Sequence, residues 1–193
     1  MIDLCVVKCD ENEVKKKSKE IVEGLKEIYD NFNDSLIKEI RVEESVFGIR
    51  GSYNYNSKIL TLYCINCVIC VETIVHEIIH SNSYKRARDM YFEGLTEFLT
   101  LYYLKKRVRA CLDHRFIDEI CRINKEYEIY ATFWGNLALI IGIKELWKYY
   151  SKGYNHNNID NLVKNDIYKA SFELAKRYNT KLMDLIDVIE KLE

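Results

Sequence analysis

The chain has 193 residues, 48% of them hydrophobic, and a formal net charge of -1, so it can bury a core and is no disordered tail. The near-zero charge argues against a nucleic-acid partner, and the longest apolar run, Leu137–Ile143, is too short to cross a membrane. Because Met1–Leu4 lacks the basic start and apolar stretch of a signal peptide, we expect a cytoplasmic protein.

The first part of the chain is predicted to combine short strands with one helix. Residues 2–7 alternate loosely between apolar and polar and predict a short strand. Apolar residues then recur at helical spacing, which predicts an amphipathic helix over about 12–32. Residues 41–46 are compatible with another strand. Phe47–Tyr63 predicts a β-hairpin, because two β-prone runs flank the asparagine-rich turn Asn54–Ser57.

After Cys70 the hydrophobic pattern is helical almost to the last residue. Helices are expected near 71–85, 90–108, 114–141, 143–151, 166–178 and 180–192. The predicted fold class is therefore α+β. Residues 1–193 are expected to form a single domain with a helix-plus-sheet part (1–70) and an all-helical part (71–193).

A His-Glu-x-x-His sequence, from His76 to His80, lies in the first of these helices. The apolar residues around it form one stripe at helical spacing, namely Val71, Ile74, Val75, Ile78 and Ile79. The two histidines and Glu77 fall on the opposite side. Imidazoles at positions i and i+4 can both reach one Zn²⁺, and the intervening glutamate then sits beside the metal rather than on it.

The next helix, Tyr91–Leu104, is apolar nearly all round. Its polar residues share one narrow line: Glu93, Thr96, Glu97 and Thr100. Carboxylates on a largely buried helix are costly unless a cation or hydrogen-bond partners compensate them. A surface helix with two ordinary histidines would leave these carboxylates unexplained, so the two helices together favour a metal site.

This combination resembles the gluzincin metallopeptidases, in which a Glu-Gly-x-x-Glu helix follows the His-Glu-x-x-His helix. The resemblance covers about residues 47–142. It implies a zincin-like fold in which the two motif histidines and Glu93 bind one Zn²⁺, while Glu97 accepts the free ring N–H of a ligating histidine. The short connection Ser81–Phe92 points to the minimal gluzincins. If that turn cannot close, Glu97 is the alternative third ligand.

The resemblance implies two further parts of an active site. The strand before the motif helix would be an edge strand that aligns an extended peptide by strand addition. Here that strand consists of Lys58, Ile59, Leu60, Thr61, Leu62 and Tyr63. Tyr127 resembles the tyrosine that stabilises the oxyanion in gluzincin aminopeptidases. Tyr130, His114 and His156 are alternatives, and each of these side chains is equally compatible with a packing or solvated role.

Three of the seven cysteines, Cys64, Cys67 and Cys70, are spaced as Cys-x-x-Cys-x-x-Cys before the motif helix. Their odd total and the absence of an export signal predict reduced thiols, although intracellular proteins of hyperthermophiles are an exception. We interpret the three mainly as small buried hydrophobic residues. A second metal site, with Cys111 or Cys121 as a distant fourth ligand, and a redox switch are the alternatives.

These patterns predict a zinc peptidase acting on a peptide or protein substrate. A metal-activated water would attack the peptide bond, and Glu77 would act as the general base. The metzincin pattern is excluded, because Arg86 stands where its third histidine would be. One alternative is a regulatory or interaction protein whose zinc site is closed by a fourth protein ligand. Another is a helical interaction domain without metal. The sequence leaves the oligomeric state open.

Overall fold

The structure is a computed structural model that describes residues 6–45, 49–84, 90–104, 131, 134–135, 137–138 and 142–153. These residues form two compact units, one ending at Asn82 and one beginning at Ser83. Small sheets lie in the N-terminal unit, and four helices are described in all, which confirms the predicted α+β class. Among the described residues, no helix is long and apolar enough to span a membrane.

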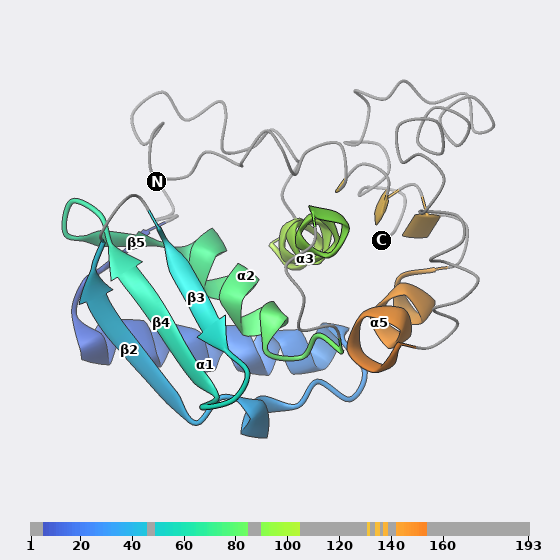
Figure 1. Ribbon diagram of the computed structural model, residues 1–193, viewed down its shortest axis with the longest axis horizontal. Helices are drawn as coiled ribbons and strands as arrows, with labels where there is room; N and C mark the ends of the chain where they lie inside the picture. The colour runs from blue at the N-terminus through green and yellow to red at the C-terminus, as the bar shows by residue number, and fades with distance from the viewer. Residues whose placement is uncertain are drawn as a thin grey trace. The chain divides into compact units, whose positions relative to one another are not determined.

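The first unit contains two small sheets (Figure 1). In one, β1 (Val6–Lys8) pairs antiparallel with β5 (Val68–Cys70). The other has three strands, β2 (Glu39–Glu44), β4 (Ile59–Cys64) and β3 (Gly51–Asn54), in the spatial order β2-β4-β3. The central strand β4 is parallel to β2 and antiparallel to β3.

The predicted hairpin is confirmed as β3 and β4. Its turn depends on Asn54, whose side-chain oxygen accepts hydrogen bonds from the N–H groups of Asn56 at 3.0 Å and Ser57 at 3.1 Å. Lys58 then adopts a left-handed conformation with φ of 59°. The strand left open at residues 41–46 is β2, and it begins two residues earlier than the pattern suggested.

Helix α1 (Glu11–Ile28) is capped at its N-terminus by Asp10, whose carboxylate accepts a hydrogen bond from the Glu13 N–H at 2.9 Å. The helix is four residues shorter than predicted at its C-terminal end. Tyr29 and Phe32 are buried after the helix has ended, and their apolar character extended the pattern beyond it. Asn31 has a φ of 62°, a left-handed conformation that does not continue a helix.

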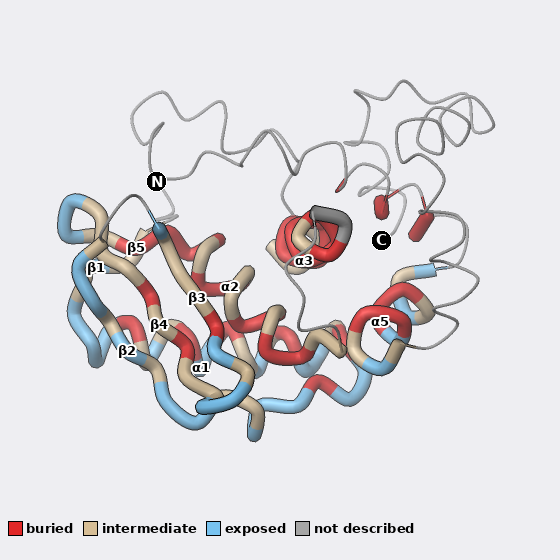
Figure 2. Tube along the Cα trace, viewed as in Figure 1, coloured by how far each residue is buried: buried red, intermediate tan, exposed pale blue. Residues whose placement is uncertain are grey.

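One face of the three-stranded sheet packs against α1 and against α2 (Val71–His80). On β4, Leu60 and Leu62 are fully buried, whereas the alternating residues Ile59, Thr61 and Tyr63 are partly exposed. Figure 2 shows that α2 is largely buried, whereas strand β2 is largely exposed. Helix α2, assigned by its pattern to the helical part, therefore belongs with the sheet.

The second unit contains α3 (Met90–Tyr103) and α5 (Ile143–Lys152). Its core is rich in aromatic side chains, and Phe92 of α3 stacks on Tyr150 of α5 with ring centroids 5.7 Å apart. The Tyr84 N–H donates to the Tyr150 carbonyl at 3.0 Å. Helix α5 is followed by Gly153, whose φ of 66° is the left-handed conformation common at helix C-termini.

Several predicted features lie outside the described residues. They are the helices over 166–178 and 180–192, most of the helix over 114–141, the continuation of α3 past residue 104, and the residues Tyr127, Tyr130, His114, His156, Cys111 and Cys121. These features stay predictions.

Candidate metal centre

Helix α2 carries the two motif histidines as the sequence predicted. Its apolar stripe is closed off from solvent, with Ile74, Val75, Ile78 and Ile79 at 0% exposure. His76, Glu77 and His80 are only partly buried on the other side of the helix. Because this stripe packs against the rest of the first unit, it determines which way the histidines on the other side of α2 face.

The two imidazole rings approach each other through their Nε2 atoms. Nε2 of His76 and Nε2 of His80 lie 3.0 Å apart, and the ring planes are inclined at 73°. Two nitrogen ligands of a tetrahedral zinc ion are roughly 3.3 Å apart when each Zn–N bond is about 2.0–2.1 Å. The spacing of the two Nε2 atoms therefore fits one ion that both rings bind.

Glu93 completes a group that could hold a metal ion. His76, His80 and Glu93 each offer one ligand atom, and these atoms all lie within 4.8 Å of one another. Two imidazoles and one carboxylate form a donor set that suits zinc. Within the ranges that the structure describes, no other group of three or more histidine, cysteine, aspartate or glutamate side chains meets this spacing.

The polar residues that share one side of α3 are two threonines and two glutamates, and they have different surroundings. Thr96 Oγ1 donates to the Phe92 carbonyl at 2.8 Å and lies 3.0 Å from the Tyr150 hydroxyl. Thr100 Oγ1 donates to the Thr96 carbonyl at 2.8 Å. The threonine hydroxyls are thus used within the second unit. Glu97 is 5% exposed, more deeply buried than Glu93, and its predicted hydrogen bond to a ligating histidine stays a prediction.

The expectation that Lys58–Tyr63 is an edge strand is wrong. This segment contains β4, which pairs with β2 on one side and with β3 on the other. Its main-chain groups therefore have strand partners on both sides, and it cannot accept an added peptide strand. In the three-stranded sheet, as far as the structure describes it, β2 and β3 are the edge strands, and β3 is the one that packs against α2. The pattern could not reveal this order, because β2 reaches β4 by a parallel pairing that skips β3.

The expectation of reduced thiols is wrong for two cysteines. Cys9, which follows β1, forms a disulfide with Cys64 at the end of β4, with their Cα atoms 5.9 Å apart. Cys67 is exposed, and Cys70 is buried. Because the Cys64 thiol is consumed, the three spaced cysteines do not form a three-thiolate metal site in this state. Buried Cys70 agrees with the interpretation as a small hydrophobic residue.

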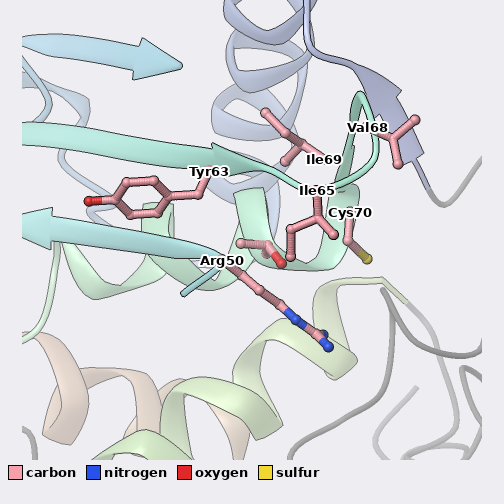
Figure 3. Close-up of a pocket in the computed structure, with 7 residues that line it drawn as sticks. Arg50, Tyr63, Ile65, Val68, Ile69 and Cys70 are labelled. Carbon is pink, nitrogen blue, oxygen red and sulfur yellow. The ribbon is translucent and has the colours of Figure 1, made fainter. Parts of the chain in front are cut away.

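A small hollow lies beside the first turn of α2 and is separate from the histidines. It is lined by Arg50, Tyr63, Ile65, Val68, Ile69, Cys70 and Thr73 (Figure 3). The side chains of Arg50 and Tyr63 point in different directions within it. The lining combines polar and apolar groups, and we assign it no chemical role.

Sequence reasoning missed two residues that bear on this centre. Gly51 lies against Glu77, and Asn82, two residues after His80, binds the backbone of Asn33. Both depend on contacts between segments far apart in the sequence, and no local pattern identifies such partners. No protein family, curated protein or solved structure matches the chain.

Proposed function

We propose that the protein is a zinc-dependent peptidase of the gluzincin type. The observation that carries this proposal is the group formed by His76, His80 and Glu93, with Glu77 on the same helix as the histidines. The proposal also draws on the resemblance of the two helix motifs to the minimal gluzincins. The proposal requires an open fourth position for water, whereas a fourth protein ligand would make the site structural.

Each side chain has a defined role in this proposal. His76, His80 and Glu93 would hold the ion. When bound, zinc supplies Lewis-acid polarisation of the scissile carbonyl and lowers the pKa of water at the site. Glu77 accepts the proton of the attacking water on its carboxylate and delivers it to the leaving amine. Tyr127 is the first candidate for the hydrogen bond to the oxyanion.

The peptide would bind at β3. Tyr63 N–H donates to the Arg50 carbonyl at 2.9 Å, so Arg50 and Tyr63 form a hydrogen-bonded pair. In an antiparallel ladder such pairs alternate with pairs whose main-chain groups point away from each other. Gly51 and Tyr53 then direct their N–H and C=O groups to the open edge. An extended substrate adds a strand there.

The test is Glu77→Gln, assayed with a peptide library by mass spectrometry and with zinc content by elemental analysis. We expect kcat/KM to fall by about 10²-fold or more, since general acid–base catalysis contributes that much, while zinc content is unchanged. Glu43→Gln, the same change at an exposed residue of β2, is the control and should cleave like the wild type. Undiminished cleavage by Glu77→Gln would refute its role as base. A zinc-loaded wild type that cleaves nothing in the library would refute the peptidase assignment.

A further inference from the structure

Gly51 is the first residue of β3, one of the strands that contact the motif helix α2. It lies opposite Leu62 of β4, and Leu62 is fully buried on the face of the sheet that packs against the helices. Residues directly opposite each other in an antiparallel pair share a face. The side of Gly51 on which a side chain would stand is therefore the side of α2, the helix next to β3 in Figure 1.

Glu77 occupies the space that a side chain at position 51 would need. A Cβ atom built on Gly51 would lie 2.6 Å from Glu77 Cγ, 3.0 Å from Oε1 and 3.1 Å from Cδ. Carbon atoms in contact are normally about 3.5–4.0 Å apart. The aliphatic stem and the carboxylate of Glu77 thus lie directly against the main chain of Gly51.

The backbone of Gly51 does not itself require glycine. Only Gly142 and Gly153 among the described glycines have positive φ, so position 51 has a conformation that other residues can adopt. Glycine inside a strand weakens it, and alanine at a compatible position is normally neutral or stabilising. The absent side chain is therefore explained by the space that Glu77 fills.

We propose that Gly51 is a positioning residue for Glu77. By lacking a Cβ atom it lets the carboxylate lie against the edge strand where the peptide would bind, and any larger residue would displace it. Glu77 has three rotatable side-chain bonds, so an added methyl group is relieved by moving the carboxylate rather than the helix. This inference rests on the proposed role of Glu77 as general base.

The first test is Gly51→Ala in the zinc-loaded chain of 193 residues. We expect kcat to fall by about 10²-fold, the size of effect that a 1 Å misplacement of a reacting group can have. Zinc content should be unchanged, and KM should change much less than kcat. Gly24→Ala makes the same substitution inside α1, away from the histidines, and should leave kcat at the wild-type value. A Gly51→Ala variant with wild-type kcat would overturn the inference.

The second test does not depend on catalysis. Melting temperatures of the wild type, Gly51→Ala, Glu77→Ala and the double variant form a double-mutant cycle. Glu77→Ala removes the three atoms that obstruct a Cβ at position 51. The change in melting temperature that Gly51→Ala causes should therefore be more favourable in the Glu77→Ala background than in the wild type. The expected difference is roughly 2–4 °C for a chain of this size. Equal shifts in the two backgrounds would overturn the inference.

The two tests separate this inference from the proposed function. If the wild type cleaves no peptide but the cycle shows coupling, the peptidase assignment fails while the packing of Gly51 against Glu77 holds. If the wild type is active, Glu77→Gln is inactive and Gly51→Ala is fully active, the general base is correct and the positioning role of Gly51 is wrong.

Discussion

Asn82 and Asn33 are joined by two hydrogen bonds, although they are 49 residues apart in the sequence. The Asn33 N–H donates to Asn82 Oδ1 at 2.8 Å, and Asn82 Nδ2 donates to the Asn33 carbonyl at 3.3 Å. Asn33 follows the end of α1, and Asn82 is the second residue after His80. The pair therefore ties the C-terminal end of the motif helix to the chain that leaves α1.

Asn82→Ala should lower the free energy of unfolding by about 1–2 kcal/mol, because it removes three hydrogen bonds of a 6%-exposed side chain: the two with Asn33 and one from Asn82 Nδ2 to Ser81 Oγ at 3.0 Å. Loosening the end of α2 should also weaken zinc retention through His80. Urea denaturation of the zinc-free protein measures the first effect, and competition with a zinc chelator measures the second.

The control is Asn12→Ala on the exposed surface of α1, where the change should be within about 0.5 kcal/mol. An Asn82→Ala variant as stable as this control would show that the hydrogen bonds of the Asn82 side chain do not hold the end of α2.

The motif helix was predictable from sequence for a physical reason. A helix buries a face that repeats every 3.6 residues, so Ile74, Val75, Ile78 and Ile79 defined its buried side, and the histidines followed on the other. The hairpin was equally local, because Asn54 forms its own turn. In both cases the residues that determine the structure are neighbours in the chain.

The order of the strands was not predictable in the same way. The parallel pairing of β2 with β4 joins residues 20 positions apart, as in Glu39 with Ile59, and no local pattern encodes it. The Cys9–Cys64 disulfide spans 55 residues. Strand β5 has only three residues, too few for a period to be read. Of these features, the parallel pairing of β2 with β4 is the one that makes β4 central and leaves β3 at the edge of the sheet.

Glu93→Gln and Glu97→Gln distinguish the two glutamates that the sequence offered as third ligand. The residues lie one turn apart on α3, so each variant is the control for the other. We expect Glu93→Gln to weaken zinc affinity by well over tenfold, since even residues that only support a ligand change it by about 10–100-fold. Glu97→Gln should have the smaller effect. Titration with zinc in a chelator buffer measures both.

The opposite order, with zinc bound normally by Glu93→Gln and lost from Glu97→Gln, would transfer the ligand role to Glu97. Equal and negligible effects would leave the two histidines as the protein ligands from this pair of helices.

The disulfide should contribute to the stability of the first unit. Cys9→Ser combined with Cys64→Ser opens a loop of 55 residues, and we expect a loss of about 2–4 kcal/mol in the free energy of unfolding. Reduction of the wild type should give a similar loss. Peptide mapping without reductant should recover the linked Cys9 and Cys64 peptides. If urea denaturation gives the same midpoint with and without reductant, the bond does not form or does not stabilise.

Cys67→Gly should stabilise the protein, because Cys67 occupies a position that favours glycine. Asn66 and Cys67 have φ values of 52° and 62°, and they form the tight turn between Ile65 and Val68, whose backbone groups exchange two hydrogen bonds. Two consecutive positive φ values define the hairpin turn for which Asn-Gly is the preferred sequence. A left-handed conformation costs a residue with a Cβ atom about 1–2 kcal/mol.

Glycine at position 67 relieves that cost but adds conformational freedom to the unfolded chain, so the expected net gain is about 0.5–1 kcal/mol. Cys67→Ala is the matched control, since it removes the exposed sulfur and keeps the Cβ atom. Urea denaturation should give Cys67→Gly a higher free energy of unfolding than the wild type, and Cys67→Ala a value close to that of the wild type. An equal gain in both variants would assign the effect to loss of the thiol, and it would contradict the explanation from backbone conformation.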